Sequence, residues 1–169
     1  TEDPVLVQGH GHYTDDLNLP RQAYAYFVRS RNGHGVIKAI DTATARGMPG
    51  VLAIYTGAYL SAYGIMKCVV PFKNRDGSDM PKPVQRPLTT DKVRFVGDPV
   101  AVVVAETAKQ ARDGAEAVFV DIDPLPAVTT AAAAAAPGAP LVHEGVPGNV
   151  VLDFHHGDAD AVAAAFARA

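Results

Sequence analysis

The stretch from residue 93 to residue 123 constrains the fold of this chain most strongly. Its first part, VRFVGDPVAVVVAE, indicates a strand, a turn at Gly97-Asp98-Pro99 and an apolar strand over 100–105. Thr107 is suited to cap a helix of about twelve residues. The run VFVDID at 118–123 is typical of a further strand. A strand, a helix and a strand in this order predict a βαβ crossover with parallel strands and a right-handed connection.

Strand patterns also occur outside this stretch. They lie at residues 23–30, 36–40, 51–56 and 149–158. The first two are close enough in sequence to form a hairpin. Together with the crossover, these strands predict an α+β fold with a mixed sheet, one βαβ unit and flanking helices.

Short helices are indicated mainly by their caps. Asp41 is suited to cap a helix at 43–46, and Asp158 is suited to cap a last helix in DADAVAAAFARA. Gly64 is a stop residue for one helical turn at 57–64.

Three segments carry no regular pattern. Residues 1–20 fit either a loop or a short strand, and the alanine run 131–136 fits either a helical turn or a slack connector. Residues 71–90 contain four prolines and an Asp-Gly pair, which predict a long surface loop. Loops of about 20 residues in compact domains usually bind a partner or are disordered.

Charges in the 71–90 loop leave two interpretations open. The basic residues are Lys73, Arg75, Lys82 and Arg86, and Asp76, Asp79 and Asp91 dilute them. The loop is therefore either an electrostatic docking site or an ordinary solvated loop.

Size and composition exclude several classes of protein. The 169 residues suit one domain, 1–169, and a net charge of −3 argues against a nucleic-acid-binding module. A single cysteine excludes an internal disulfide framework and an all-cysteine metal or iron–sulfur site. No apolar run approaches the roughly 18 residues of a membrane span, and the opening TEDP is no signal peptide. Because the chain starts on Thr1 and ends inside a helical pattern, we expect it to be an excerpt of a longer protein. We also expect that protein to be cytoplasmic.

Histidines are the first candidates for a metal site. His10 and His12 would share one face of a strand, with Asp15 and Asp16 close behind. A metal site needs three or four convergent ligands, so hydrogen-bonded or surface histidines are the simpler interpretation. The pair His155-His156 points to opposite strand faces, and His143-Glu144 fits a solvated pair in a connector. We therefore assign no metal ligand.

Other candidate chemistries also lack support. Cys68 lies between apolar neighbours in MKCVV, which predicts a buried structural thiol. The glycines of GHGH at 9–12 do not form a dinucleotide-binding fingerprint, and no G-x-S-x-G motif is present. Asp121 and Asp123 share one strand face, where a solvated strand end is a simpler interpretation than a carboxylate dyad. No catalytic or cofactor-binding residue is assigned.

Several ordered motifs nevertheless resemble a known family. The chain opens with Gly9-x-Gly11-x-Tyr13-x-Asp15-Asp16, followed by YFVRS at 26–30 and His34-Gly35-x-Ile37. The later motifs are MPGV at 48–51, VRFVGDPVA at 93–101, Ala111-x-Asp113-x-Ala115-Glu116-Ala117-Val118 and VDID-x-LP at 120–126. In this order and spacing they resemble the molybdenum hydroxylases, namely xanthine dehydrogenase, aldehyde oxidase and aerobic carbon monoxide dehydrogenase. The resemblance is to the N-terminal α/β-hammerhead domain of the large chain, with the carbon-monoxide-dehydrogenase type as the nearest variant.

The resemblance implies a parent enzyme whose chemistry lies elsewhere. In this family the large chain continues into molybdopterin-binding domains, and partner subunits or domains carry iron–sulfur clusters and FAD. The catalytic glutamate and the pterin-binding segments of the family lie downstream, so no position of this sequence matches them.

We therefore expect a structural and docking domain of a molybdenum-dependent oxidoreductase that hydroxylates or oxidises a small substrate with water as oxygen source. The domain alone would hold no cofactor and would not be catalytic. Two alternatives stay open: a free-standing protein-binding module, and a small metal-dependent hydrolase that uses His10, His12 and Asp15.

Overall fold

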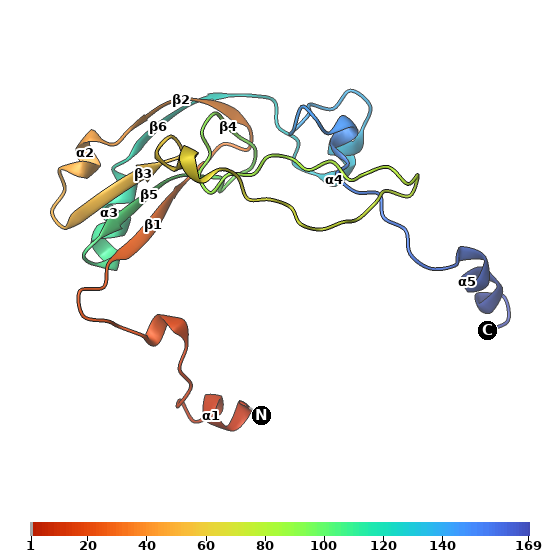
Figure 1. The fold of residues 1–169 in the computed structure, drawn as a ribbon, viewed down its shortest axis with the longest axis horizontal. Coiled ribbons are helices and arrows are strands. Elements are labelled where there is room, and N and C mark those ends of the chain that lie inside the picture. Colours follow the sequence, from red (N-terminus) through yellow and green to blue (C-terminus); the bar gives the residue numbers. More distant parts are fainter. Residues whose placement is uncertain (1) are drawn as a thin grey trace. The chain divides into compact units, whose positions relative to one another are not determined.

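A computed structural model describes residues 2–169 of the chain. The strands are β1 (Tyr24–Arg29), β2 (Gly35–Asp41), β3 (Val51–Thr56), β4 (Lys92–Val93), β5 (Pro99–Ala105) and β6 (Phe119–Pro124). The α-helices are α1 (Asp3–Val7), α2 (Ala43–Arg46), α3 (Ala108–Glu116), α4 (Ala131–Ala135) and α5 (Ala159–Phe166), as Figure 1 shows. Three 3-10 helices are η1 (Thr14–Asp16), η2 (Tyr59–Tyr63) and η3 (Pro147–Asn149).

The described residues form two compact units. Unit 1 comprises residues 2–28, 41–54 and 102–119, and unit 2 comprises residues 29–40, 55–101 and 120–169. A three-stranded sheet with the order β1-β5-β3 lies mainly in unit 1, and a second sheet with the order β4-β2-β6 lies mainly in unit 2.

Unit 1 is built on close packing between α3 and the first sheet. Thr107 caps α3 as predicted, because its Oγ1 accepts a hydrogen bond of 3.2 Å from the backbone N–H of Gln110. A Cβ atom at Gly114 would lie 3.0 Å from Cγ2 of Val51 and 3.1 Å from Cγ1 of Val103. A larger residue at this position would push the helix away from the sheet, so the glycine permits the close contact.

Unit 2 is organised around β2, the middle strand of its sheet. β2 pairs antiparallel with β4, and Gly35 lies opposite the fully buried Val93. A Cβ atom at Gly35 would lie 2.4 Å from Cγ2 of Ile122, on β6. The glycine therefore allows β6 to approach the start of β2 closely.

The α+β class and the hammerhead fold are confirmed, whereas two predicted strand pairings are wrong. β5, α3 and β6 follow one another as predicted, yet β5 and β6 belong to different sheets, so they do not form a βαβ crossover in one mixed sheet. β1 and β2 also lie in different sheets and form no hairpin. Hydrophobic periodicity indicates that a segment is a strand but does not specify its partner.

The segment from residue 149 to residue 158 is not the strand that its pattern predicted. Its backbone contacts residues 74 and 75 through two hydrogen bonds of Asp153. The carbonyl oxygen of Asp153 accepts from the N–H of Arg75 at 2.8 Å, and its N–H donates to Oδ1 of Asn74 at 3.0 Å. Because one of these acceptors is a side chain, no regular ladder continues from this point.

Residues 65–87, which we call the arm, contain no helix and no strand of either sheet. Two isolated antiparallel bridges, Met66 with Gln85 and Lys73 with Asp79, join its two sides into a long two-stranded loop. The predicted loop 71–90 includes most of the arm, but Leu88 and Thr89 near its end are buried.

The cap predicted at Asp158 is confirmed, because Asp158 accepts from the N–H of Ala161 at 2.9 Å at the start of α5. Asp41 accepts from the N–H of Ala43 at 2.8 Å, but the N-cap position of α2 is Thr42. Thr130, which was not predicted as a cap, caps α4 in the alanine run by accepting from the N–H of Ala133 at 3.2 Å. Residues 2–20 contain α1 and η1 with irregular segments around them, so the predicted alternative of a short strand is wrong.

Candidate functional site

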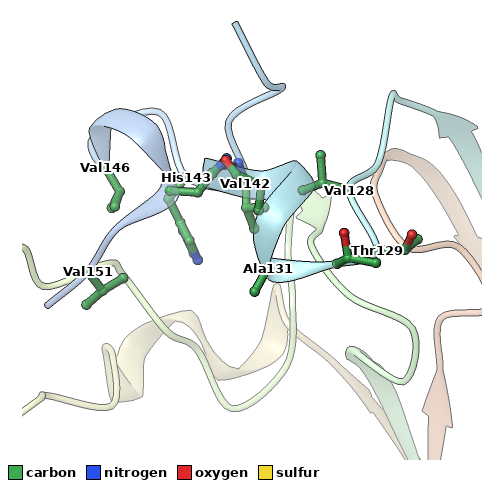
Figure 2. Close-up of a pocket in the computed structure, with 10 residues that line it drawn as sticks. Val128, Thr129, Ala131, Val142, His143, Val146 and Val151 are labelled. Atoms are coloured by element: carbon green, nitrogen blue, oxygen red, sulfur yellow. Dashed lines mark hydrogen bonds between the residues drawn. The ribbon is translucent and has the colours of Figure 1, made fainter. Parts of the chain in front are cut away.

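A pocket in unit 2 is the first candidate site. It has a volume of about 360 Å³ and lies between α4 and the segment that follows this helix, residues 136–149, which we call the connector. Its lining residues are Val128, Thr129, Thr130, Ala131, Ala134, Val142, His143, Val146, Asn149 and Val151. In Figure 2 the His143 ring points into this largely aliphatic pocket. The lining contains no lysine, arginine or carboxylate, so the pocket suits an apolar group.

Asn149 shapes the wall of this pocket. Its Oδ1 accepts from the N–H of Val142 at 2.8 Å, and its Nδ2 donates to the carbonyl oxygens of Ala134 at 2.9 Å and Pro140 at 3.0 Å. Asn149 also has a positive φ of 57°, a conformation that asparagine tolerates better than most residues. One side chain thus ties α4 to residues 140 and 142 of the connector.

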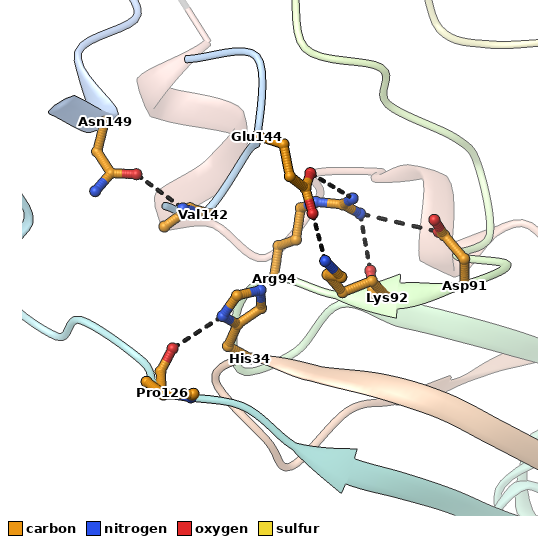
Figure 3. Close-up of polar contacts among 8 residues, drawn as sticks. All are labelled: His34, Asp91, Lys92, Arg94, Pro126, Val142, Glu144 and Asn149. Atoms are coloured by element: carbon orange, nitrogen blue, oxygen red, sulfur yellow. Dashed lines mark hydrogen bonds and ion pairs between the residues drawn. The ribbon is translucent and has the colours of Figure 1, made fainter. Parts of the chain in front are cut away.

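A polar cluster beside the pocket joins β2, β4 and the connector (Figure 3). His34 is buried, and its Nδ1 lies 2.9 Å from the carbonyl oxygen of Pro126. Because a carbonyl only accepts, Nδ1 must carry the proton and donate it, which leaves Nε2 as an acceptor in the neutral ring. Nε2 of His34 and Nε of Arg94 are buried without a hydrogen-bond partner among the described residues.

Glu144 is the anionic partner in this polar cluster. Its carboxylate accepts a hydrogen bond from Nζ of Lys92 and lies 3.9 Å from Nη2 of Arg94. Arg94 also donates through Nη1 to the carbonyl oxygen of Lys92 at 2.9 Å. The hydrogen bond from Lys92, with its positive charge, lowers the pKa of Glu144 from 4.5 to about 2. The carboxylate is therefore ionised at every pH near neutrality.

His143 adds a titratable group at the edge of the same cluster. Burial, and then the positive charge of Arg94, lower the pKa of its imidazole below 6.5. The ring is therefore neutral at pH 7. The ion pairs and hydrogen bonds of this cluster thus join β4 to the connector. The cluster contains no nucleophile that is paired with a base.

The histidines considered as metal ligands lie apart from these features. His10 and His12 are exposed and follow α1, so they do not share the face of a strand. Among residues 2–169 no group of three His, Cys, Asp or Glu side chains is placed to hold a metal ion. His155 and His156 are exposed, and the His156 ring stacks 6.4 Å from Phe154. The hydrolase alternative therefore has no support from the geometry of the described residues.

The prediction for Cys68 is wrong, and the importance of Asp98 was missed. Cys68 is exposed, because its apolar neighbours are in the arm and not in a core. Asp98 was interpreted as an ordinary turn residue, yet it is buried. It accepts from the Thr89 hydroxyl at 2.7 Å and from the N–H of Arg94 at 2.9 Å. Asp121 and Asp123 are exposed on β6.

The basic loop residues divide into two groups. Lys73 pairs with Asp79 at 2.8 Å, and Arg75 pairs with Asp153 at 3.3 Å. Lys82 and Arg86 have no salt-bridge partner among the residues that the structure describes. No helix in residues 2–169 is both long and apolar enough to cross a bilayer.

Comparison with known proteins gives consistent matches. A family model described as "Aldehyde oxidase and xanthine dehydrogenase, a/b hammerhead domain" matches residues 8–126. The carbon monoxide dehydrogenase large chain of Afipia carboxidovorans is 35% identical, over 99% of this chain and 21% of its own length. The xanthine dehydrogenase molybdenum-binding subunit of Escherichia coli is 36% identical, over 82% of this chain and 18% of its own.

A solved structure agrees with these matches. The reconstituted CO dehydrogenase from Oligotropha carboxidovorans superimposes with a TM-score of 0.71 at 35% identity, over 99% of this chain and 21% of that chain. This chain therefore spans about a fifth of the length of the relatives that it matches.

Proposed function

Because this chain belongs to the aldehyde oxidase and xanthine dehydrogenase family and contains its a/b hammerhead domain, we propose that it is a structural and docking domain in the large subunit of a molybdenum hydroxylase. The observation that carries the proposal is 35% identity over 99% of the chain to a carbon monoxide dehydrogenase large chain. The parent enzyme would hydroxylate or oxidise a small substrate, with water as the oxygen source.

The molybdenum cofactor does not fit the pocket of unit 2. Molybdopterin carries a phosphate, whereas the pocket of unit 2 has neither lysine nor arginine in its lining. The three-ligand metal group that a bare metal would need is also absent from the described residues. We therefore propose that the cofactor binds in other domains of the large subunit, and we assign no catalytic step to this chain.

The proposed partners follow from the family. They are the molybdopterin-binding domains of the same subunit, together with iron–sulfur and FAD-containing subunits or domains that would carry electrons away. The name of the Escherichia coli relative, a molybdenum-binding subunit, supports the first of these. The predicted cytoplasmic location stays a prediction.

The test combines the length of the reading frame with the molybdenum content of the purified proteins. We expect the reading frame to encode a large chain about five times as long as this one, since 99% of this chain covers 21% of a relative. The purified large chain should contain molybdenum, and the 169-residue chain should contain none. Stoichiometric molybdenum in the 169-residue chain would contradict the proposal, and a reading frame that stops after Ala169 would favour the free-standing binding module.

A further inference from the structure

The arm has a defined backbone but no core of its own. At its base the N–H of Met66 donates to the carbonyl oxygen of Gln85 at 2.8 Å, and at its tip the N–H of Asn74 donates to the carbonyl oxygen of Ser78 at 2.9 Å. Gly77, with a φ of 85°, turns the chain between the two sides. The two sides are therefore held in register at both ends.

The segment 150–156 lies against the tip of the arm, and Figure 1 shows these two stretches of unit 2 side by side. Besides the two backbone hydrogen bonds of Asp153, the guanidinium of Arg75 pairs with its carboxylate at 3.3 Å. The rings of Phe72 and Phe154 are 5.1 Å apart. These contacts join the arm and the segment into one surface, which we call the arm surface.

Apolar side chains of the arm surface are exposed. They include Val69, Val70, Phe72, Val84, Val151 and Phe154. Val151 also lines the pocket beside α4, so the arm surface continues into an aliphatic hollow. Monomeric proteins rarely expose large groups of apolar side chains, and a group of this kind is typical of a site that contacts another protein, a ligand or a membrane.

Charge indicates what the covering surface is like. The exposed Lys67 and Lys82 have no salt-bridge partner among residues 2–169. Lys73 and Arg75, in contrast, are neutralised by Asp79 and Asp153. A complementary surface would be apolar at its centre and would carry carboxylates opposite the two free lysines.

We propose that the arm surface docks against the molybdenum-binding remainder of the same large chain, an inference that rests on the proposed function. The matched relatives extend over about five times the length of this chain, so such a remainder is the most extensive surface available to it. Permanent interfaces are also more apolar than those of partners that dissociate. This favours a covalently linked domain over the electron-transfer subunits.

The test uses the natural large chain with single substitutions. Val69→Asp changes an arm-surface valine that is 85% exposed, and Val96→Asp is the matched control at a valine that is 70% exposed outside the arm surface. Hydrogen exchange of peptides covering 65–72 and 80–87 is followed by mass spectrometry. We expect Val69→Asp to speed exchange of the arm amides about tenfold and Val96→Asp to leave it within about twofold, because only the first puts a charge into the docked interface.

A milder variant keeps the test decisive if the Val69→Asp large chain does not accumulate. Val69→Ser should speed exchange about threefold. Equal exchange in the wild-type chain and in both Val69 variants would overturn the inference. If the wild-type large chain contains molybdenum but its arm exchanges as fast as in both Val69 variants, the inferred docking of the arm surface is wrong and the proposed function stands. If no molybdenum-containing large chain exists, the proposed function fails and this inference fails with it.

Discussion

β5 and the arm are both rich in valine, yet they have opposite environments. In β5 the side chains of Val100, Val103 and Ala105 are fully buried, whereas in the arm Val69 and Val84 are exposed. β5 is the middle strand of its sheet, so both of its edges are paired, while the arm has only isolated bridges.

The difference shows that apolar composition does not by itself place a segment in a core. The arm contains Pro71, Pro81, Pro83 and Pro87, and each proline lacks the N–H that a sheet ladder needs. Val69 and Val84 are exposed, so the part of the chain that the structure describes does not cover them. We infer that they are buried only by another surface.

The same substitution in the two regions gives the largest expected contrast. Val103→Asp places a carboxylate in a fully buried site with no cationic partner, which should lower the free energy of unfolding by about 3–5 kcal/mol. This is a large part of the total stability of a domain. Urea denaturation followed by circular dichroism measures the change. A loss below about 1 kcal/mol would show that β5 is not the rigid core described above.

The next largest effect concerns the turn that leads into β5. Asp98→Ala removes the acceptor for the Thr89 hydroxyl and for the N–H of Arg94, so we expect the free energy of unfolding to fall by about 2–3 kcal/mol. Asp98→Asn is the control, because its amide oxygen can retain one of the two bonds, and it should cost about half as much. Equal stability of all three proteins in urea would mean that Asp98 does not organise this turn.

A smaller, pH-dependent effect is expected at the polar cluster. The folded-state pKa of Glu144 is about 2, below the usual 4.5. Its ion pairs therefore stabilise the fold fully above pH 4.5, and this stabilisation is lost as the pH falls toward 2. Glu144 is mostly exposed, so Glu144→Gln should cost about 0.2–1 kcal/mol at pH 6.

The same difference should shrink as the pH is lowered from 4.5 toward 2, because the carboxylate of the unfolded chain takes up a proton below its usual pKa of 4.5 and the folded carboxylate does so only near 2. The glutamine side chain stays neutral throughout this range. Thermal unfolding of both proteins across this range checks the effect. A difference of equal size at pH 6 and pH 2.5 would show that Glu144 acts by packing and not by charge.

The smallest effect on stability is expected in the arm. Val69→Asp in the 169-residue chain should change the free energy of unfolding by less than about 0.5 kcal/mol, because Val69 is already in water. The urea midpoint compared with that of Val103→Asp checks this directly. A loss similar to that of Val103→Asp would show that the arm packs into a core, and the distinction between the two regions would disappear.

Local features of the fold were predictable from the sequence. Thr107 and Asp158 cap helices where the sequence placed them, since a cap depends on residues only three positions apart. The strands β3 and β5 were also predicted within one residue. Family membership was predictable as well, because it depended on several motifs in a fixed order.

Long-range features were not predictable in the same way. The contact between His34 and Pro126 joins residues 92 positions apart, and no local pattern indicates it. The burial of Asp98 and the exposure of Cys68 likewise depend on which segments meet in space. The sheet partners of β5 and β6 also depend on which distant segments meet, and no local pattern predicts them.

The most direct test of the account compares the arm in two lengths of the wild-type chain. Hydrogen exchange of the amides in residues 65–72 is measured in the 169-residue chain and in the natural large chain under the same conditions. If the arm surface docks onto the remainder of the large chain, exchange in the large chain should be at least about tenfold slower, while β5 should exchange slowly in both. Equal and rapid exchange of the arm in both proteins would contradict the account.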